Sequence, residues 1–131
     1  MIYVDANVII RLLEGDAATR APLEARLLPL RGTGRFLVTS RLSRLECRVK
    51  PLRINDTALT AIFDAFFNSA EVEILELTPE VVEKATELRA TLNLKTPDAL
   101  HVASAILAGA AAFLTGDLGL TRCTEIPIEV L

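Results

Sequence analysis

Short apolar runs separated by helix-periodic segments are the feature that most limits how this chain can fold. The runs fall at residues 2–4, 36–38, 72–77, 112–114 and 128–130. Each has the length of one buried strand. Strands that alternate with helices are typical of α/β domains, because parallel strands need a crossover connection between them. The pattern therefore predicts an α/β fold with a mainly parallel central sheet.

The segments between these runs carry helix signals. Thr78-Pro79 and Thr96-Pro97 each combine a capping hydroxyl with a proline that we expect at the first helical position. Residues 55–68 and 81–92 repeat apolar side chains every three or four positions, which predicts one-sided helices that cover a core. Residues 99–108 are apolar on nearly every face, so we expect that helix to pack against both sheet and helix.

Length and composition fit one compact domain that spans residues 1–131. A chain of 131 residues with 51% hydrophobic residues can bury about two-thirds of its unfolded surface. No internal repeat, low-complexity tract or linker divides it. No apolar run approaches the roughly 18 residues of a membrane helix, and an acid follows the first run. We therefore expect a soluble, cytoplasmic protein without membrane contact.

The charge balance limits how the protein could bind nucleic acid. A net charge of -3 and a pI near 5.2 exclude the broadly basic surface of passive nucleic-acid binders. The one local cationic cluster is formed by Arg41, Arg44 and Arg48, which share one side of a predicted helix. They form either a solvated helix face or a surface that grips RNA phosphates.

Residues that serve soft-metal or metal-free catalysis are scarce. His101 is the only histidine, which disfavours a histidine-rich zinc site and a two-histidine acid–base ribonuclease. We expect it to be a hydrogen-bonded helix histidine. Cys47 and Cys123 match no metal-ligand spacing, and we expect both to be buried or incidental thiols.

Three acids lie at predicted strand ends or at a predicted helix start, where α/β folds commonly bind ligands. Asp5 directly follows the first run, and Asp117 follows the run at 112–114 after a short turn. Parallel strands bind ligands beyond their carboxyl ends, so these two acids meet if their strands are neighbours at the topological switch point. Asp98 lies near the start of the helix predicted after Thr96, where the helix dipole favours an ionised carboxylate.

A fourth acid, Glu46, lies on a predicted helix that begins after Ser40. A projection at about 100 degrees per residue places Glu46 with Leu42, Leu45 and Val49 on the arc that we expect to face inward. An inward-facing acid needs a partner. Because the arginines lie on the opposite side, we expect that partner to be a metal ion.

Converging carboxylates would require a cation. Two unit charges about 4 Å apart repel by about 4 kcal/mol at an effective dielectric constant of about 20. Hard oxygen ligands select Mg²⁺ or Mn²⁺. Taken singly, each acid also has a structural interpretation, as a turn residue, a helix cap or a partner of the helix dipole.

The order of these motifs resembles the PIN domain family, in particular the VapC-type toxins of toxin–antitoxin pairs. The resemblance covers nearly the whole chain. It rests on Ile2-Tyr3-Val4-Asp5-Ala6-Asn7, Thr39-Ser40 with Glu46, Thr96-Pro97-Asp98-Ala99-Leu100-His101-Val102-Ala103, and Phe113-Leu114-Thr115-Gly116-Asp117.

The resemblance implies a three-layer α/β/α sandwich with an acidic active site. It implies that the acids Asp5, Glu46, Asp98 and Asp117 bind the metal and catalyse the reaction. It further implies that Asn7 and Thr115 support these acids through hydrogen bonds.

The function implied by the resemblance is that of a metal-dependent endoribonuclease, the toxin of a type II toxin–antitoxin system. Mg²⁺ or Mn²⁺ would lower the pKa of a bound water for phosphodiester hydrolysis of RNA. Glu46 or Asp98 could orient or deprotonate that water while Asp5 and Asp117 anchor the metal, but the sequence assigns neither these roles nor the number of ions. The implied protein partners are a VapB-type antitoxin and a second copy of the chain.

Two alternatives belong to other classes. A phosphoacceptor receiver module predicts paired acids after the first strand and a lysine beyond a late strand, whereas this chain has Asp5-Ala6-Asn7 and no lysine after Lys95. A PIN-like protein that acts on structured DNA, or mainly as a binding partner, would need added arches or domains. A chain of 131 residues leaves little room for them.

Overall fold

A five-stranded parallel sheet lies at the centre of the computed structural model, which describes residues 1–131. The order across the sheet is β3-β2-β1-β4-β5, and every neighbouring pair is parallel. The α/β prediction is thereby confirmed. The strands are β1 (Ile2–Val4), β2 (Leu37–Ser40), β3 (Val72–Leu75), β4 (Ala112–Thr115) and β5 (Ile128–Val130).

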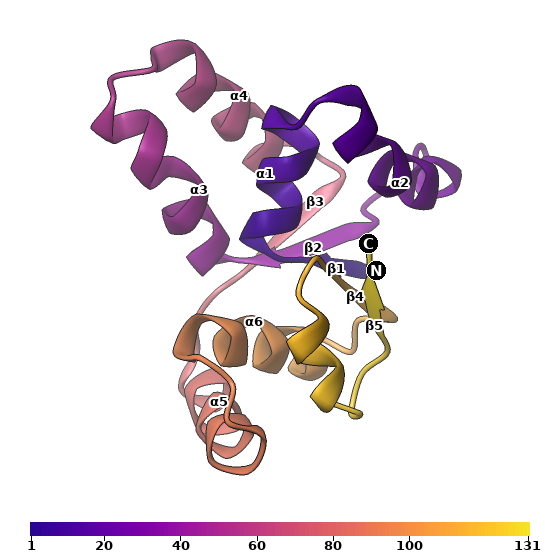
Figure 1. Ribbon diagram of the computed structural model, residues 1–131, viewed down its shortest axis with the longest axis vertical. Helices are drawn as coiled ribbons and strands as arrows, with labels where there is room; N and C mark the ends of the chain where they lie inside the picture. Colours follow the sequence, from indigo (N-terminus) through magenta and orange to yellow (C-terminus); the bar gives the residue numbers. More distant parts are fainter.

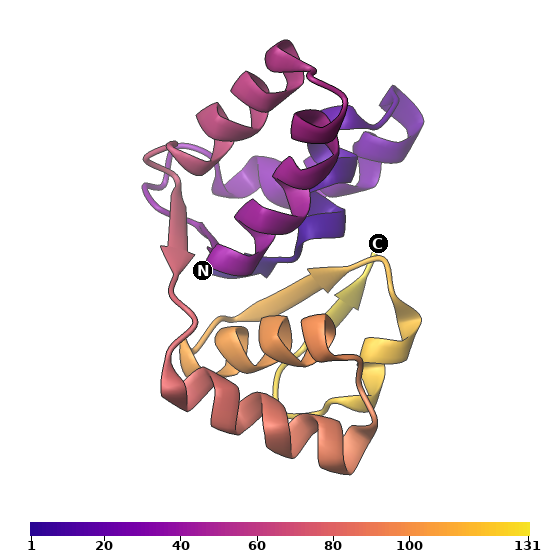
Figure 2. The same ribbon diagram turned by 90° about the vertical axis from the view of Figure 1, so that its left-hand side faces the viewer.

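Helices cover both faces of the sheet, which gives three layers (Figure 1). Figure 2 shows α5 and α6 on one face of the sheet and the other α-helices on the opposite face. The first layer holds α1 (Ala6–Glu14), α2 (Ala17–Leu27), α3 (Arg41–Arg53) and α4 (Thr57–Phe67). The second holds α5 (Pro79–Leu92) and α6 (Thr96–Leu107), and short 3-10 helices span Leu28–Leu30 and Leu118–Arg122.

The strands divide their side chains between two hydrophobic cores, because successive residues of a strand point to opposite faces. Ile2 and Val4 pack in the core beneath α1 to α4. Tyr3 packs in the other core, with residues of α5 and α6. In the sheet Tyr3 lies between Val38 of β2 and Phe113 of β4. The central strand thus presents a tyrosine to the α6 layer.

Several predicted boundaries differ from the structure. The run at 36–38 becomes β2, which extends to Ser40, and the run at 72–77 becomes β3, which ends at Leu75. The chain turns away there, because the Thr78 amide donates to the carbonyl of Glu76 at 3.1 Å. Thr78 caps α5 as predicted, and its side chain accepts from the Val81 amide.

The predicted cap at Thr96 is wrong. Lys95 is the N-cap of α6, with an extended backbone at φ -66° and ψ 153°, and no side chain caps the helix. The Lys95 carbonyl accepts the amide of Ala99 at 2.9 Å, so Thr96 and Pro97 are already the first two helical residues. Asp98 therefore lies one position further into the helix than expected, but still in its first turn.

Two further expectations concern the cysteines and membrane contact. Cys47 and Cys123 are both free and buried, as predicted. Burial raises the pKa of the Cys47 thiol to about 12. None of the helices combines the length and the apolar character that crossing a membrane requires.

Phe63 tests the importance of the core beneath α1 to α4. Its side chain is fully buried, and truncation would leave a cavity that the packed layers cannot fill. We expect Phe63→Ala to lower the free energy of unfolding by about 3 to 5 kcal/mol. Urea denaturation measures this loss. Leu118→Ala is the control, since Leu118 is 71% exposed, and a loss of equal size in both variants would contradict this packing.

Candidate active site

Asp5 is held at the carboxyl end of β1 by two hydrogen bonds. It is the N-cap of α1, and its Oδ1 atom accepts from the Val8 amide at 3.0 Å. Its Oδ2 atom accepts from the Thr115 hydroxyl at 3.2 Å. The residue is only 6% exposed. Both carboxylate oxygens are therefore fixed in direction by the protein.

Thr115, the last residue of β4, connects Asp5 with the loop that carries Asp117. Its Oγ1 atom accepts from the Asp117 amide at 3.0 Å while its proton goes to Asp5. Asp117 is exposed, and its Oδ1 atom accepts from the Gly119 amide at 2.8 Å. Because β1 and β4 are neighbours, the acids that follow them share one edge of the sheet.

Asp98 reaches the same edge from the start of α6 and is half-buried. Burial raises the pKa of Asp98, and the charges of Asp117 and Glu46 raise it further. Burial likewise raises the pKa of Asp5, and the charge of Asp98 adds to this effect. The acids thus act on one another across the edge and disfavour full ionisation.

The arc of α3 that hydrophobicity predicts to face inward is wrong for Leu45 and Val49, whereas Glu46 on the same arc is half-buried. The residues of α3 that face the core are Ser43, Cys47 and Pro51, whereas Leu45 is 60% exposed and Val49 is 41% exposed. The small Ser43 side chain packs closely against the sheet because its hydroxyl lies 2.7 Å from that of Thr39. This contact rotates α3 away from the arc that hydrophobicity indicates.

Glu46 has a protein partner, which the sequence did not indicate. Its Oε1 atom lies 2.6 Å from Nε2 of His101, and the Glu46 side chain is 33% exposed. The other ring nitrogen of His101, Nδ1, lies 2.8 Å from the hydroxyl of Tyr3. His101 is thus a hydrogen-bonded helix histidine, as expected. The only available signal for this contact was a histidine on an otherwise apolar helix.

The donor set fits a hard divalent cation in its chemistry, since it consists of carboxylates, and the pKa of two of them, Asp5 and Asp98, is raised by burial and by the charge of neighbouring acids. No group of three His, Cys, Asp or Glu side chains is arranged to hold one ion as it stands. Asp5 is fixed, but Asp117 is exposed and Asp98 half-buried. A cation would therefore have to draw these two side chains inward.

The supporting residues differ in what they contact. Thr115 bonds to Asp5 and receives the Asp117 amide. Asn7 is exposed, and its side chain makes no hydrogen bond to any of the acids. Its role stays a prediction.

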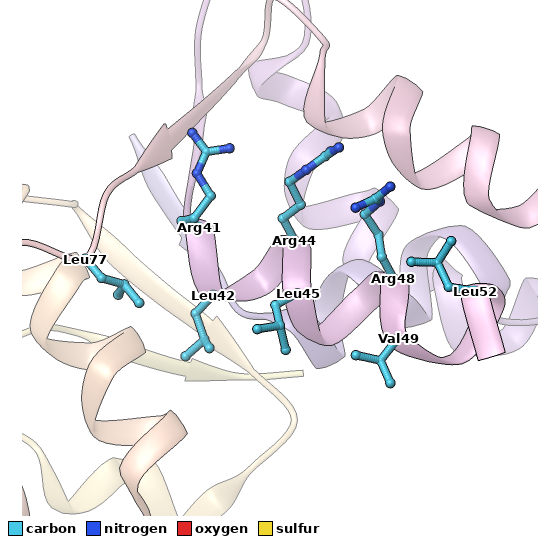
Figure 3. Close-up of a pocket in the computed structure, with 8 residues that line it drawn as sticks. All are labelled: Arg41, Leu42, Arg44, Leu45, Arg48, Val49, Leu52 and Leu77. Carbon is cyan, nitrogen blue, oxygen red and sulfur yellow. The ribbon is translucent and has the colours of Figure 1, made fainter.

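A groove of about 400 Å³ runs beside the site along α3. Figure 3 shows its arginines on one side of the helix and Leu42, Leu45 and Val49 on the other. Arg41 pairs with Glu76. Arg44 and Arg48 lie 3.2 and 3.0 Å from Oδ1 of Asp64 on α4. The arginine side chains therefore already have acidic partners within the protein.

Comparison with known proteins identifies a family whose model matches this chain. The family model for the PIN domain matches residues 2–125. No curated protein matches the chain.

Solved structures share the fold at low sequence identity. VapBC2 from Rickettsia felis, bound to a DNA fragment from its promoter, aligns at 17% identity with a TM-score of 0.78, over 99% of this chain and 98% of the other. VapBC-1 from nontypeable Haemophilus influenzae aligns at 17% identity with a TM-score of 0.77, over 99% and 98%. The Mycobacterium tuberculosis toxin VapC20, described as cleaving the sarcin–ricin loop, aligns at 20% identity with a TM-score of 0.71, over 96% and 98%.

The raised pKa of Asp5 predicts a specific pH dependence of stability. Between the ordinary aspartate pKa and the raised value, the folded state binds more protons than the unfolded state, so stability falls as pH rises through this window. Asn at position 5 can still cap α1 but carries no charge. We therefore expect Asp5→Asn to be more stable than the unsubstituted protein near pH 7, with a gain that disappears at acidic pH.

Urea denaturation at several pH values, with a chelator present, measures this difference. Asp16→Asn is the matched control, since Asp16 caps α2 in the same way. The Thr19 amide lowers the pKa of Asp16, so loss of its charge should reduce stability near pH 7. An Asp5→Asn variant that is less stable than the unsubstituted protein near pH 7 would contradict the prediction.

Proposed function

The chain belongs to the PIN domain family, and on this basis we propose that it is a metal-dependent endoribonuclease that hydrolyses RNA phosphodiester bonds. The observation that carries the proposal is the gathering of acids from separate elements at the carboxyl edge of β1 and β4, where burial and the charges of neighbouring acids raise the pKa of Asp5 and of Asp98. The proposed catalytic acids are Asp5, Glu46, Asp98 and Asp117.

Mg²⁺ or Mn²⁺ is the proposed cofactor, because all of these donors are hard oxygen atoms. Asp5, Asp98 and Asp117 would hold it, with Glu46 beside them. When bound, such an ion lowers the pKa of a coordinated water and stabilises charge on the phosphoryl oxygens. It would also remove the charge repulsion that adds to the effect of burial on the pKa of Asp5 and of Asp98.

The four acids differ in burial, and we propose their roles on this basis. Asp5 is buried and held by Val8 and Thr115, so it provides a fixed anchor. Asp98 and Asp117 are more exposed and can turn toward a ligand. Glu46 is partly exposed at the edge, which suits it to orient a water molecule that approaches the phosphorus.

We further propose that the protein is the toxin of a type II toxin–antitoxin system, with a VapB-type antitoxin as partner. The solved structures that share its fold include toxin–antitoxin complexes, among them one from Klebsiella pneumoniae at 21% identity. The exposed apolar residues of α3, Leu45, Val49 and Leu52, support a protein partner. A homodimer and a cytoplasmic RNA substrate belong to the same proposal.

Loss of the fixed anchor should abolish cleavage. We expect Asp5→Asn to lower the rate of Mg²⁺- or Mn²⁺-dependent RNA cleavage by about 100-fold or more, because it removes a metal-binding charge without disturbing the helix cap. Purified protein incubated with total RNA, with each metal or with a chelator, measures the effect. Asp16→Asn, which changes an equivalent cap away from the site, should keep full activity.

The same pair of variants can be expressed from an inducible promoter in bacteria. Growth arrest is expected from the unsubstituted chain and from Asp16→Asn, but not from Asp5→Asn. Cleavage that survives chelation, or equal arrest by all three proteins, would overturn the proposed function.

The role of the arginines can be separated from their ion pairs with Asp64. If Arg44 and Arg48 grip RNA phosphates, the double variant Arg44→Gln/Arg48→Gln should bind RNA more weakly. A plot of the logarithm of its RNA-binding constant against the logarithm of the salt concentration should have a slope that is shallower by about one unit for each phosphate that the protein no longer binds. Asp64→Asn breaks the same ion pairs but frees both arginines, so it should strengthen binding. Filter binding at several salt concentrations distinguishes the two, and equal weakening by both variants would show a purely structural role.

A further inference from the structure

Three polar side chains form a continuous chain through the interior next to the acids. Tyr3 on β1 is fully buried and His101 on α6 is 3% exposed. The Tyr3 hydroxyl lies 2.8 Å from Nδ1 of His101, and Nε2 of His101 lies 2.6 Å from Oε1 of Glu46. The ring of Tyr3 stacks on that of Phe113, with centroids 4.9 Å apart and an interplanar angle of 13°.

This chain joins the two helical layers. Glu46 lies on α3, above the sheet, and His101 on α6, below it. No other side-chain hydrogen bond or ion pair connects a helix of one layer to a helix of the other. His101 is also one helical turn from Asp98 on α6, so the contact lies directly at the acidic edge.

The chemistry of the three groups fixes the direction of their hydrogen bonds. An ionised carboxylate only accepts, so Nε2 must donate to Glu46. In a singly protonated ring Nδ1 is then an acceptor, and the hydroxyl of Tyr3 is its donor. A phenol ordinarily has a pKa of about 10, so at neutral pH the hydroxyl of Tyr3 keeps the proton that this bond needs.

We propose that Tyr3 and His101 are positioning residues for the ribonuclease reaction, and that together they hold the Glu46 carboxylate in place. The Glu46 carboxylate requires the proton on Nε2, the hydroxyl of Tyr3 donates to the bare Nδ1 and holds the ring in this orientation, and Nε2–H fixes Oε1 of Glu46. The second carboxylate oxygen of Glu46 is then left for the site. This inference rests on the proposed function of Glu46. Outer hydrogen-bond partners of this kind orient catalytic and metal-binding groups in many enzymes.

His101 itself is not a catalytic residue in this arrangement. Both of its ring nitrogens are within hydrogen-bonding distance of protein partners, and the residue is buried. Neither nitrogen is free to exchange a proton with a substrate. Its effect on the reaction must therefore pass through Glu46.

Nitrogen NMR tests the hydrogen-bond chain independently of any nuclease activity. Because His101 is the only histidine, a long-range ¹H–¹⁵N spectrum of the labelled protein contains one set of ring signals. We expect Nε2 to be protonated and Nδ1 bare. Tyr3→Phe removes only the hydroxyl and keeps the aromatic ring, so Nε2 should stay protonated for Glu46 while the ¹⁵N shift of Nδ1 moves downfield, because Nδ1 has lost its hydrogen-bond donor. A protonated Nδ1 in the unsubstituted protein, or an unchanged spectrum in Tyr3→Phe, would overturn the proposal.

Kinetics test the effect on Glu46. His101→Leu removes the donor and should lower kcat for RNA cleavage by about 10- to 100-fold with little change in KM. His101→Gln places an amide donor near the position of Nε2 and should recover part of the loss. Equal kcat in the Leu and Gln variants, with equal urea midpoints, would show that His101 only fills the core and would overturn the proposal.

Tyr3→Phe provides the same measurement should His101→Leu fail to fold. Its kcat should fall while KM stays constant, and an unchanged kcat would count against positioning. An inactive unsubstituted protein would refute the proposed function alone. The NMR result would still decide whether the Tyr3 hydroxyl donates to Nδ1 of His101.

Discussion

Strand β1 pairs with β2 on one side and with β4 on the other, and the positions of the acids depend on this arrangement. The chain builds β2 and β3 outward from β1 and later returns to add β4 and β5 on the opposite side. Helices that leave β1 and β4 therefore diverge to different faces, and the space between them opens at the carboxyl edge of the sheet. Asp5 and Thr115 meet across this gap in a hydrogen bond of 3.2 Å.

The parts of this arrangement that depend on local sequence could be predicted. Asp5 follows an apolar run directly and Asp117 follows one after a short turn, and neighbouring parallel strands place such residues at a common edge whatever the rest of the fold. Asp98 also lies at a helix start, although Lys95 rather than Thr96 caps that helix. A one-residue shift of the cap leaves Asp98 in the first turn, so the error had little effect on the predicted position of this acid.

The parts that depend on tertiary packing could not be predicted. Hydrophobicity placed Leu45 and Val49 inward, but the contact of Ser43 with Thr39 turns the small residues of α3 toward the sheet. The partner of Glu46 was equally hidden, because His101 is 55 residues away in sequence and belongs to the opposite helical layer. A buried histidine needs polar partners, but periodicity does not show from which element they come.

Movement of the Asp5 side chain cannot relieve the repulsion between its carboxylate and the neighbouring acids. Its carboxylate caps α1 and accepts from Thr115, so displacement would leave the Val8 amide and the Thr115 hydroxyl without a partner in a buried region. The charge of Asp98 nevertheless raises the pKa of Asp5 on top of the effect of burial. A bound proton relieves this repulsion at low pH, and only a cation can relieve it when all the acids are ionised. The hydrogen bonds that fix Asp5 therefore favour cation binding at this edge, because they hold its carboxylate in a buried position next to the other acids.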